Sequence, residues 1–102
     1  MTIIKPARET VEIEGTIRGM QDIAEIKSTI DAMRLEAGDP LHLTIRDSFS
    51  MPSALIGYLL KLAEQQKVTL HVTVGNAGLA ELLADLNLTR IFNLRCKEAA
   101  SV

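Results

Sequence analysis

The stretch LHLTIRDSFSMPSALIGYLLKLAEQQKVTLHVTV, residues 41–74, sets the architecture of this chain. It opens with apolar and polar residues alternating over 41–45, as in a strand with one buried face, and closes with a second alternation over 68–74. Residues 52–66 are apolar at helical spacing, with Pro52 in the first turn, where its missing N–H costs nothing. Two strands joined by one helix are expected to lie parallel and adjacent in one sheet.

The two strands of this stretch repeat one pattern: leucine, histidine, an apolar residue, threonine and a β-branched residue. Because side chains alternate between the faces of a strand, one face is expected to pack against helices. That face carries Leu41, Leu43, Ile45, Leu70, Val72 and Val74, and the other carries His42, Thr44, His71 and Thr73. Two histidines could contribute to a metal site, but zinc usually takes three or four protein ligands, and no carboxylate or thiol is spaced to join them. A polar, partly solvated face is the favoured interpretation, and no metal or other cofactor is expected.

Outside this stretch the chain continues to alternate strands and helices. Residues 10–17 alternate apolar and polar residues, as in a half-buried strand, and a shorter strand is expected around residues 3–4. Residues 22–38 have apolar residues at helical spacing, with Asp22 placed to cap the start and Gly38 to close the end.

The C-terminal part predicts one more helix and one more strand. Asn76 is a favourable N-cap, and residues 89–95 are expected to form the last short strand before a frayed tail at 97–102. The predicted fold is α/β, a single layer of four to five mixed, mainly parallel strands with helices packed on the sheet. The helices are expected at 22–37, 52–66 and 77–86. The residues expected to be largely buried are Leu43, Ile45, Leu55, Leu59, Val72, Val74, Leu82 and Leu83.

The composition predicts a cytoplasmic protein that binds neither nucleic acid nor membrane. The 102 residues have the length of one domain, with an ordered core expected at about residues 10–95. The 11 basic and 13 acidic residues form no basic run, and no tryptophan, one tyrosine and two phenylalanines offer no platform for stacking bases. No apolar segment approaches the roughly 18 to 20 residues of a membrane span, and the N-terminus has no apolar signal region. A single cysteine, Cys96, fits a reducing compartment.

Four segments, in their order and spacing, resemble the STAS domain family, which includes the anti-sigma factor antagonists. They are IEGTI (13–17), LHLTI (41–45) followed by Phe49, ALIGYLLKLAEQQKVTLHV (54–72) and GLAELLADLNLTRIFNL (78–94). The last is the closest match: a helix, then Leu-x-Leu, then a short strand carrying Ile-Phe. The resemblance covers roughly residues 10 to 94. It implies a bacterial regulatory domain that binds a serine kinase acting as an anti-sigma factor, in a circuit that regulates transcription.

The chain departs from that family where the family carries its regulatory phosphate. There the central strand usually ends in Asp-Ser, followed by a small residue and Gly-Leu, and the serine is phosphorylated. Aligned on Leu55, this chain has Pro52 at the serine position and Met51 at the aspartate. Aligned on the preceding strand, it has Met51 at the serine and Ser50 at the aspartate. The dipeptide Asp-Ser itself, residues 47–48, lies about one turn too early for the helix start.

The segment FSMPSA, residues 49–54 and here called the hinge, still carries two serines beside a predicted helix N-terminus. Unpaired N–H groups and the positive end of the helix dipole stabilise a phosphate there. Ser53 is therefore the first candidate phosphoacceptor and Ser50 the second. The alternative stays open that Ser50 or Met51 is only an N-cap and Ser53 an ordinary first-turn residue.

The helix after the hinge is apolar almost all round. One stripe, sufficient to pack on the sheet, consists of Ala54, Leu55, Tyr58, Leu59 and Leu62. A second stripe, rotated away from the first, consists of Ile56, Leu60 and Ala63. Burial on both sides is hard to arrange in a small layered domain, so the second stripe is expected to be exposed and to contact a partner or another copy of the chain. The predicted partner-binding residues are Met51, Pro52, Ile56 and Leu60.

Two functions, neither of them enzymatic, agree with these patterns. The chain has no nucleophile paired with a base in a known motif, no glycine-rich phosphate loop and no paired carboxylates at helical spacing, so an enzyme is not expected. The leading hypothesis is a regulatory protein-binding module that resembles an anti-sigma factor antagonist and is reset by a metal-dependent phosphatase. The second is a STAS-like structural subunit that docks permanently in a larger complex, such as a transporter assembly, and never takes phosphate.

Overall fold

A computed structural model describes residues 1–48 and 50–96 of the chain, with the side chain of Pro6 left out. The strands are β1 (Thr2–Ala7), β2 (Thr10–Glu14), β3 (Pro40–Ile45), β4 (Thr69–Val74) and β5 (Arg95–Cys96). The helices are α1 (Met20–Ala32), α2 (Ser53–Glu64) and α3 (Ala77–Asp85). Phe49 of the hinge and the tail expected to fray at 97–102 lie outside the described residues.

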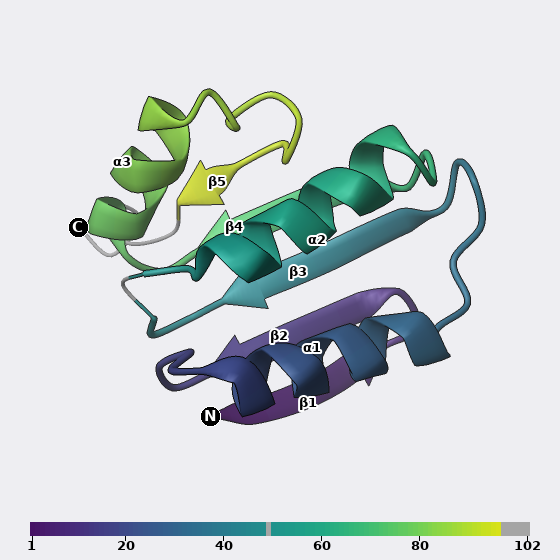
Figure 1. Cartoon of the computed structure of the whole chain (residues 1–102), viewed down its shortest axis with the longest axis horizontal. Helices are drawn as coiled ribbons and strands as arrows, with labels where there is room; N and C mark the ends of the chain where they lie inside the picture. The colour runs from purple at the N-terminus through teal and green to yellow at the C-terminus, as the bar shows by residue number, and fades with distance from the viewer. Residues whose placement is uncertain (49, 97–102) are drawn as a thin grey trace.

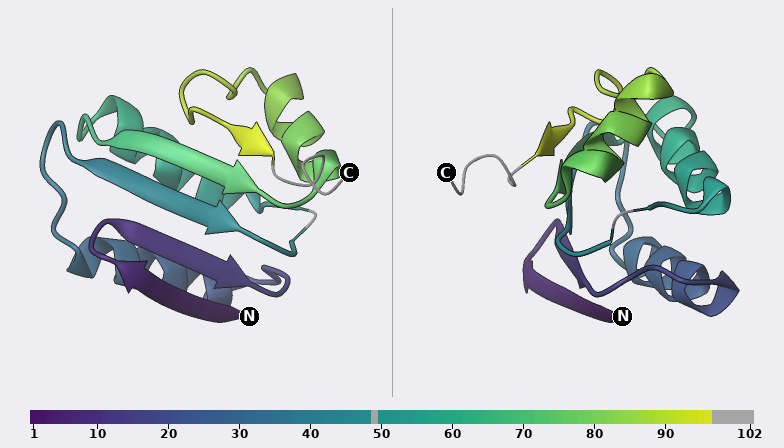
Figure 2. Two further views of the ribbon diagram at one scale, coloured as in Figure 1. Left: turned by 180° about the vertical axis from the view of Figure 1, so that it is seen from behind. Right: turned by 90° about the vertical axis from the view of Figure 1, so that its left-hand side faces the viewer.

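The strands form one five-stranded sheet in the order β1-β2-β3-β4-β5. β1 pairs antiparallel with β2, and every other neighbouring pair is parallel. The three helices cover one face of the sheet, and the view from behind shows the other face without a helix (Figures 1 and 2). The predicted α/β fold with a mixed, mainly parallel sheet is therefore confirmed, including the strand expected near the N-terminus.

The core lies between the sheet and the three helices. Alternate residues of β2, β3 and β4 are buried, and three apolar residues of α1 and of α2 are buried against them. The predicted core residues Leu43, Ile45, Leu55, Leu59, Val72, Val74 and Leu83 are all buried. The prediction that Leu82 is buried is wrong, because this residue is 39% exposed. α3 has nine residues and turns Leu79 and Leu83 to the core, so the neighbouring Leu82 lies about 100° away around the helix.

The first helix begins and ends earlier than the sequence predicts. Its N-cap is Gly19, and Asp22 lies inside the first turn, where its carboxylate accepts a hydrogen bond from the Arg18 N–H at 2.9 Å. The helix ends at Ala32 because Arg34 adopts a left-handed conformation, with φ 51°. Gly38 therefore does not close the helix; it lies in the following loop and donates its N–H to the Lys67 carbonyl.

The two later helices begin within a residue of their predicted starts. Pro52 is the N-cap of α2 rather than a residue of its first turn, and its carbonyl accepts the Leu55 and Ile56 N–H groups at 3.0 and 3.1 Å. Asn76 caps α3 as predicted, since its side-chain oxygen accepts the Leu79 N–H at 3.1 Å.

The last strand is shorter than the predicted 89–95. β5 contains only Arg95 and Cys96, and residues 89–93 form turns. In those turns Phe92 donates its N–H to the Leu88 carbonyl and Leu94 to the Thr89 carbonyl. Local hydrogen bonds thus replace most of a strand ladder, although the Phe92 carbonyl still accepts the Val72 N–H of β4 at 2.9 Å. The Phe92 side chain is fully buried.

Candidate functional site

The connection between β3 and α2 is anchored by the dipeptide just before the hinge. The Asp47 carboxylate accepts a hydrogen bond from the Gly15 N–H at 2.9 Å. The Ser48 hydroxyl accepts the Ile17 N–H at 3.3 Å and donates to the Ser50 carbonyl at 2.7 Å. Ser48 is fully buried. Asp47 and Ser48 therefore hold the β2–α1 loop against the hinge, and the Ser48 hydroxyl is not accessible to a modifying enzyme.

The two candidate phosphoacceptors are exposed. Ser53 is the first residue of α2, and Ser50 precedes the N-cap Pro52 by two residues. No side chain caps this helix N-terminus within the described residues. First-turn N–H groups lack partners inside a helix, so the Ser53 side chain lies where an added phosphate is stabilised.

Met51 does not lie on the surface. It is only 5% exposed and belongs to the apolar core, so its predicted role in partner contact has no support from its position. Pro52 is half-buried. Among the described residues of the hinge, Met51 is therefore buried, whereas Ser50 and Ser53 on either side of it are exposed. Methionine is found both in cores and at binding surfaces, so only the tertiary packing shows that Met51 is a core residue.

The second stripe of α2 is half-buried. Leu55, Leu59 and Leu62 point into the core, as predicted, whereas Ile56 and Leu60 pack partly against its edge. The expectation of a fully exposed stripe is therefore corrected. Ser53, Ile56 and Leu60 follow one another by three and four residues, which places them on one face of the helix.

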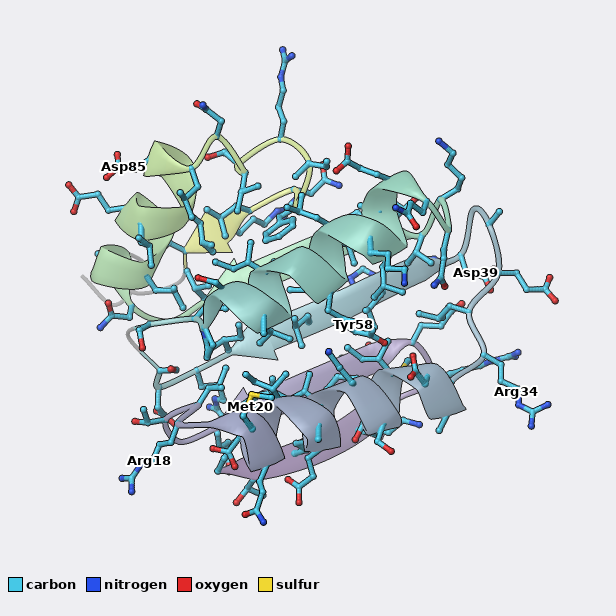
Figure 3. All side chains as sticks on the ribbon, in the orientation of Figure 1. Arg18, Met20, Arg34, Asp39, Tyr58 and Asp85 are labelled. Atoms are coloured by element: carbon cyan, nitrogen blue, oxygen red, sulfur yellow. The ribbon has the colours of Figure 1, made fainter. Side chains whose placement is uncertain are left out.

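Four large apolar residues are exposed that the sequence did not predict to be so. Leu82 of α3 and its C-cap residue Leu86 are 39% and 49% exposed, Met20 at the start of α1 is 78% exposed, and Ile4 of β1 is 38% exposed. Arg18 and Met20 lie at the end of the molecule where β3 connects to α2 (Figure 3). The spacing of Leu82 and Leu86 by four residues places them on one side of α3 and was the signal available in the sequence.

A polar contact joins α1 to α2. Tyr58 lies between the two helices (Figure 3). Its hydroxyl donates a hydrogen bond to an Asp31 carboxylate oxygen at 2.6 Å. The Lys27 ammonium lies 5.5 Å from the centre of the Tyr58 ring. Burial, followed by the hydrogen bond to Asp31 and the charge of that carboxylate, raises the pKa of the Tyr58 hydroxyl. The contact holds α2, and with it the helix start at Ser53, against α1.

The uncovered face of the sheet carries an ordered polar array. Arg46 contacts Glu14 at 2.9 Å and Glu12 at 3.6 Å. A hollow of about 410 Å³ beside them is also lined by Thr44, Thr73, Val74 and Gly75. Further along the same face the rings of His42 and His71 are stacked, 4.7 Å apart. The predicted sharing of one face by the two histidines is confirmed, and residues 1–48 and 50–96 hold no group of three or more potential metal ligands.

The described part of the chain contains no helix that is long and apolar enough to cross a membrane. The chain matches no protein-family model, no curated protein and no solved structure.

Proposed function

We propose that this chain is a regulatory protein-binding module of the STAS kind, resembling an anti-sigma factor antagonist in a partner-switching circuit. Its partner is a serine kinase that also acts as an anti-sigma factor in the bacterial cytoplasm. A metal-dependent phosphatase resets the module. The proposed binding surface consists of the exposed residues of the hinge and the second stripe of α2.

The observation that carries this proposal is the position of Ser53. It is exposed, it is the first residue of α2, and it shares a helix face with Ile56 and Leu60. An apolar stripe that is only partly covered is suited to a partner, and a modifiable side chain at its end is suited to control that partner.

The same position gives the switch its physical basis. A phosphate on Ser53 adds nearly two negative charges, which the N-terminal end of the helix dipole stabilises by about 0.3–1 kcal/mol. A partner that buries Ile56 and Leu60 must then also bury or closely approach those charges. Desolvation of unpaired charge is costly, so phosphorylation releases the partner.

A second function, permanent docking in a larger complex such as a transporter assembly, is favoured by one observation. In the alignment on Leu55, the family's phosphorylated serine corresponds to Pro52 and its aspartate to Met51. In this chain Met51 is a core residue and Pro52 is the helix N-cap. A hinge that uses those positions for packing and capping has no need of a phosphate.

Phosphosite mapping and partner capture distinguish the two functions. Purified protein is incubated with ATP and an extract of its host and analysed by mass spectrometry, and immobilised wild type, S53A and S53D are used to capture partners. The switch predicts phosphate on Ser53 or Ser50 and loss of the partner kinase from S53D. The control is S28D, which places the same charge on an exposed serine of α1.

Absence of phosphate from both serines, together with equal capture by S53D and wild type, contradicts the switch and leaves the permanent subunit. Equal loss of partner from S28D and S53D shows that charge anywhere on the surface weakens binding, and this removes the argument from Ser53.

A further inference from the structure

The uncovered face of the sheet is unusual for strands that run parallel. Strands β2 to β5 run parallel to one another, and all three helices lie on the other face (Figure 2). Parallel sheets are normally covered on both faces, whereas antiparallel sheets often leave one face to solvent. A parallel sheet with one free face therefore points to a partner that covers it. This observation is independent of the function proposed above, because the hinge and α2 belong to the opposite, helix-covered side.

Two imidazoles stand near the middle of this face. Parallel pairing places His42 directly opposite His71, and the two rings are stacked with centres 4.7 Å apart and planes inclined by 13°. Their neighbours along the two strands are the shorter side chains Pro40, Thr44, Thr69 and Thr73. Neither ring makes a hydrogen bond to a described residue. Both rings are therefore available to a ligand that approaches the face.

His42 and His71 of one chain offer two of the four ligands that a structural zinc site needs. Zinc in a structural site takes four ligands in a tetrahedron, and imidazole nitrogen is among its preferred donors. The described residues hold no third histidine, cysteine or carboxylate close enough to join the pair. We propose that the open sheet face binds a second copy of the chain through one shared zinc ion, held by His42 and His71 of each copy.

The register of the sheet gives this dimer complementary charges. A two-fold axis that runs parallel to the strands, midway between β3 and β4, places β3 over β4 of the second copy and β2 over its β5. Glu12, Thr44, Thr73 and Arg95 form one row across the sheet, in consecutive strands. Each Glu12, which also contacts Arg46 of its own chain at 3.6 Å, therefore lies opposite the second copy's Arg95. Two such pairs flank the four imidazoles and favour this orientation.

The rings need only side-chain rotation to bind the ion. Zinc–nitrogen bonds of about 2.0–2.1 Å require ligand nitrogens about 3.4 Å apart. The stacked rings therefore have to lean together at their tips, and no hydrogen bond to a described residue opposes that movement.

Sedimentation velocity with and without zinc tests the proposal. Metal-free chain is expected to sediment as a monomer and to double its mass on addition of zinc chloride, with one zinc ion per two chains by elemental analysis. EDTA is expected to reverse the change. H42N and H71N are each expected to lose the dimer, while T69N, on the same face but beside the ligand pair, keeps it.

Three results overturn the proposal: a monomer that binds no zinc, a monomer that binds one zinc per chain, and a dimer that persists in EDTA. The orientation has its own test. E12R alone is expected to weaken the zinc-dependent dimer, and E12R with R95E to restore it, with circular dichroism checking the fold of both variants. A double variant as weak as E12R contradicts the strand-parallel axis.

Discussion

The hydroxyl of Tyr58 on α2 lies 2.6 Å from a carboxylate oxygen of Asp31 on α1 and donates a hydrogen bond to that oxygen. The two residues are 27 positions apart in sequence, so the contact depends on the packing of both helices on the sheet. It binds together the helix that begins at the hinge and the helix that precedes the central strand. Because Tyr58 is the chain's one tyrosine, its ionisation can be followed without interference.

The ionisation of Tyr58 is expected to occur above the ordinary pKa of 10.0, because burial and the neighbouring Asp31 carboxylate favour the neutral hydroxyl. The unfolded chain titrates at the ordinary value. The stability that this contact contributes is thus complete below pH 10.0 and is lost as pH rises through the folded pKa. The ultraviolet absorbance of tyrosinate, recorded against pH in buffer and in denaturant, measures both values. Identical titration curves in the two conditions would show that the hydroxyl is not held by Asp31 in solution.

Replacing Ser48 with alanine is expected to destabilise the fold by about 1–3 kcal/mol, because the Ile17 N–H loses its acceptor and Ile17 is buried. Urea unfolding of S48A measures the change. The matched control is S28A, in which an exposed serine of α1 is removed and little change is expected. A variant S48A as stable as wild type would mean that solvent reaches the Ile17 N–H.

Two glycine substitutions are expected to act in opposite directions. A Cβ on Gly75 would lie 2.3 Å from the Arg46 carbonyl oxygen, so G75A requires a backbone shift and should cost about 1–3 kcal/mol or more. A Cβ on Gly57, inside α2, meets no atom within 4 Å, so G57A should stabilise by about 0.5–1 kcal/mol through helix propensity. Thermal unfolding of both variants gives the signs. A stabilising G75A would contradict the close approach of the two strand ends.

Aspartate at Ile56 or Leu60 is expected to weaken capture of the partner kinase at least tenfold, because an unpaired charge in an interface is costly. Both residues are half-buried, so circular dichroism and unfolding must accompany the binding measurement. L86D, at an exposed leucine just after α3, is the control and should retain the partner. If I56D and L60D unfold the chain, the stripe is part of the core. If L86D loses the partner as well, the binding surface extends to α3.

The order of strands and helices follows from short-range patterns in the sequence. Alternation over 41–45 and 68–74, with one apolar helix between them, favours a parallel pair, and the matching positions of His42 and His71 place both on one face. These properties depend on the period of a strand and on the sequence order of the elements, so they can be predicted without knowing distant contacts.

The roles of individual side chains at the site depend on contacts between distant parts of the chain. Ser48 resembles a modifiable serine until the β2–α1 loop, 31 residues earlier, is placed against its hydroxyl. Met51 is a core residue because the hinge turns it inward, and Leu82 is exposed because the short α3 turns Leu79 and Leu83 to the core. Local periodicity distinguishes apolar from polar faces, but burial depends on what the rest of the chain packs against each face. Ser48 is inaccessible because a distant segment, the β2–α1 loop, packs over it, whereas no such segment buries Ser53.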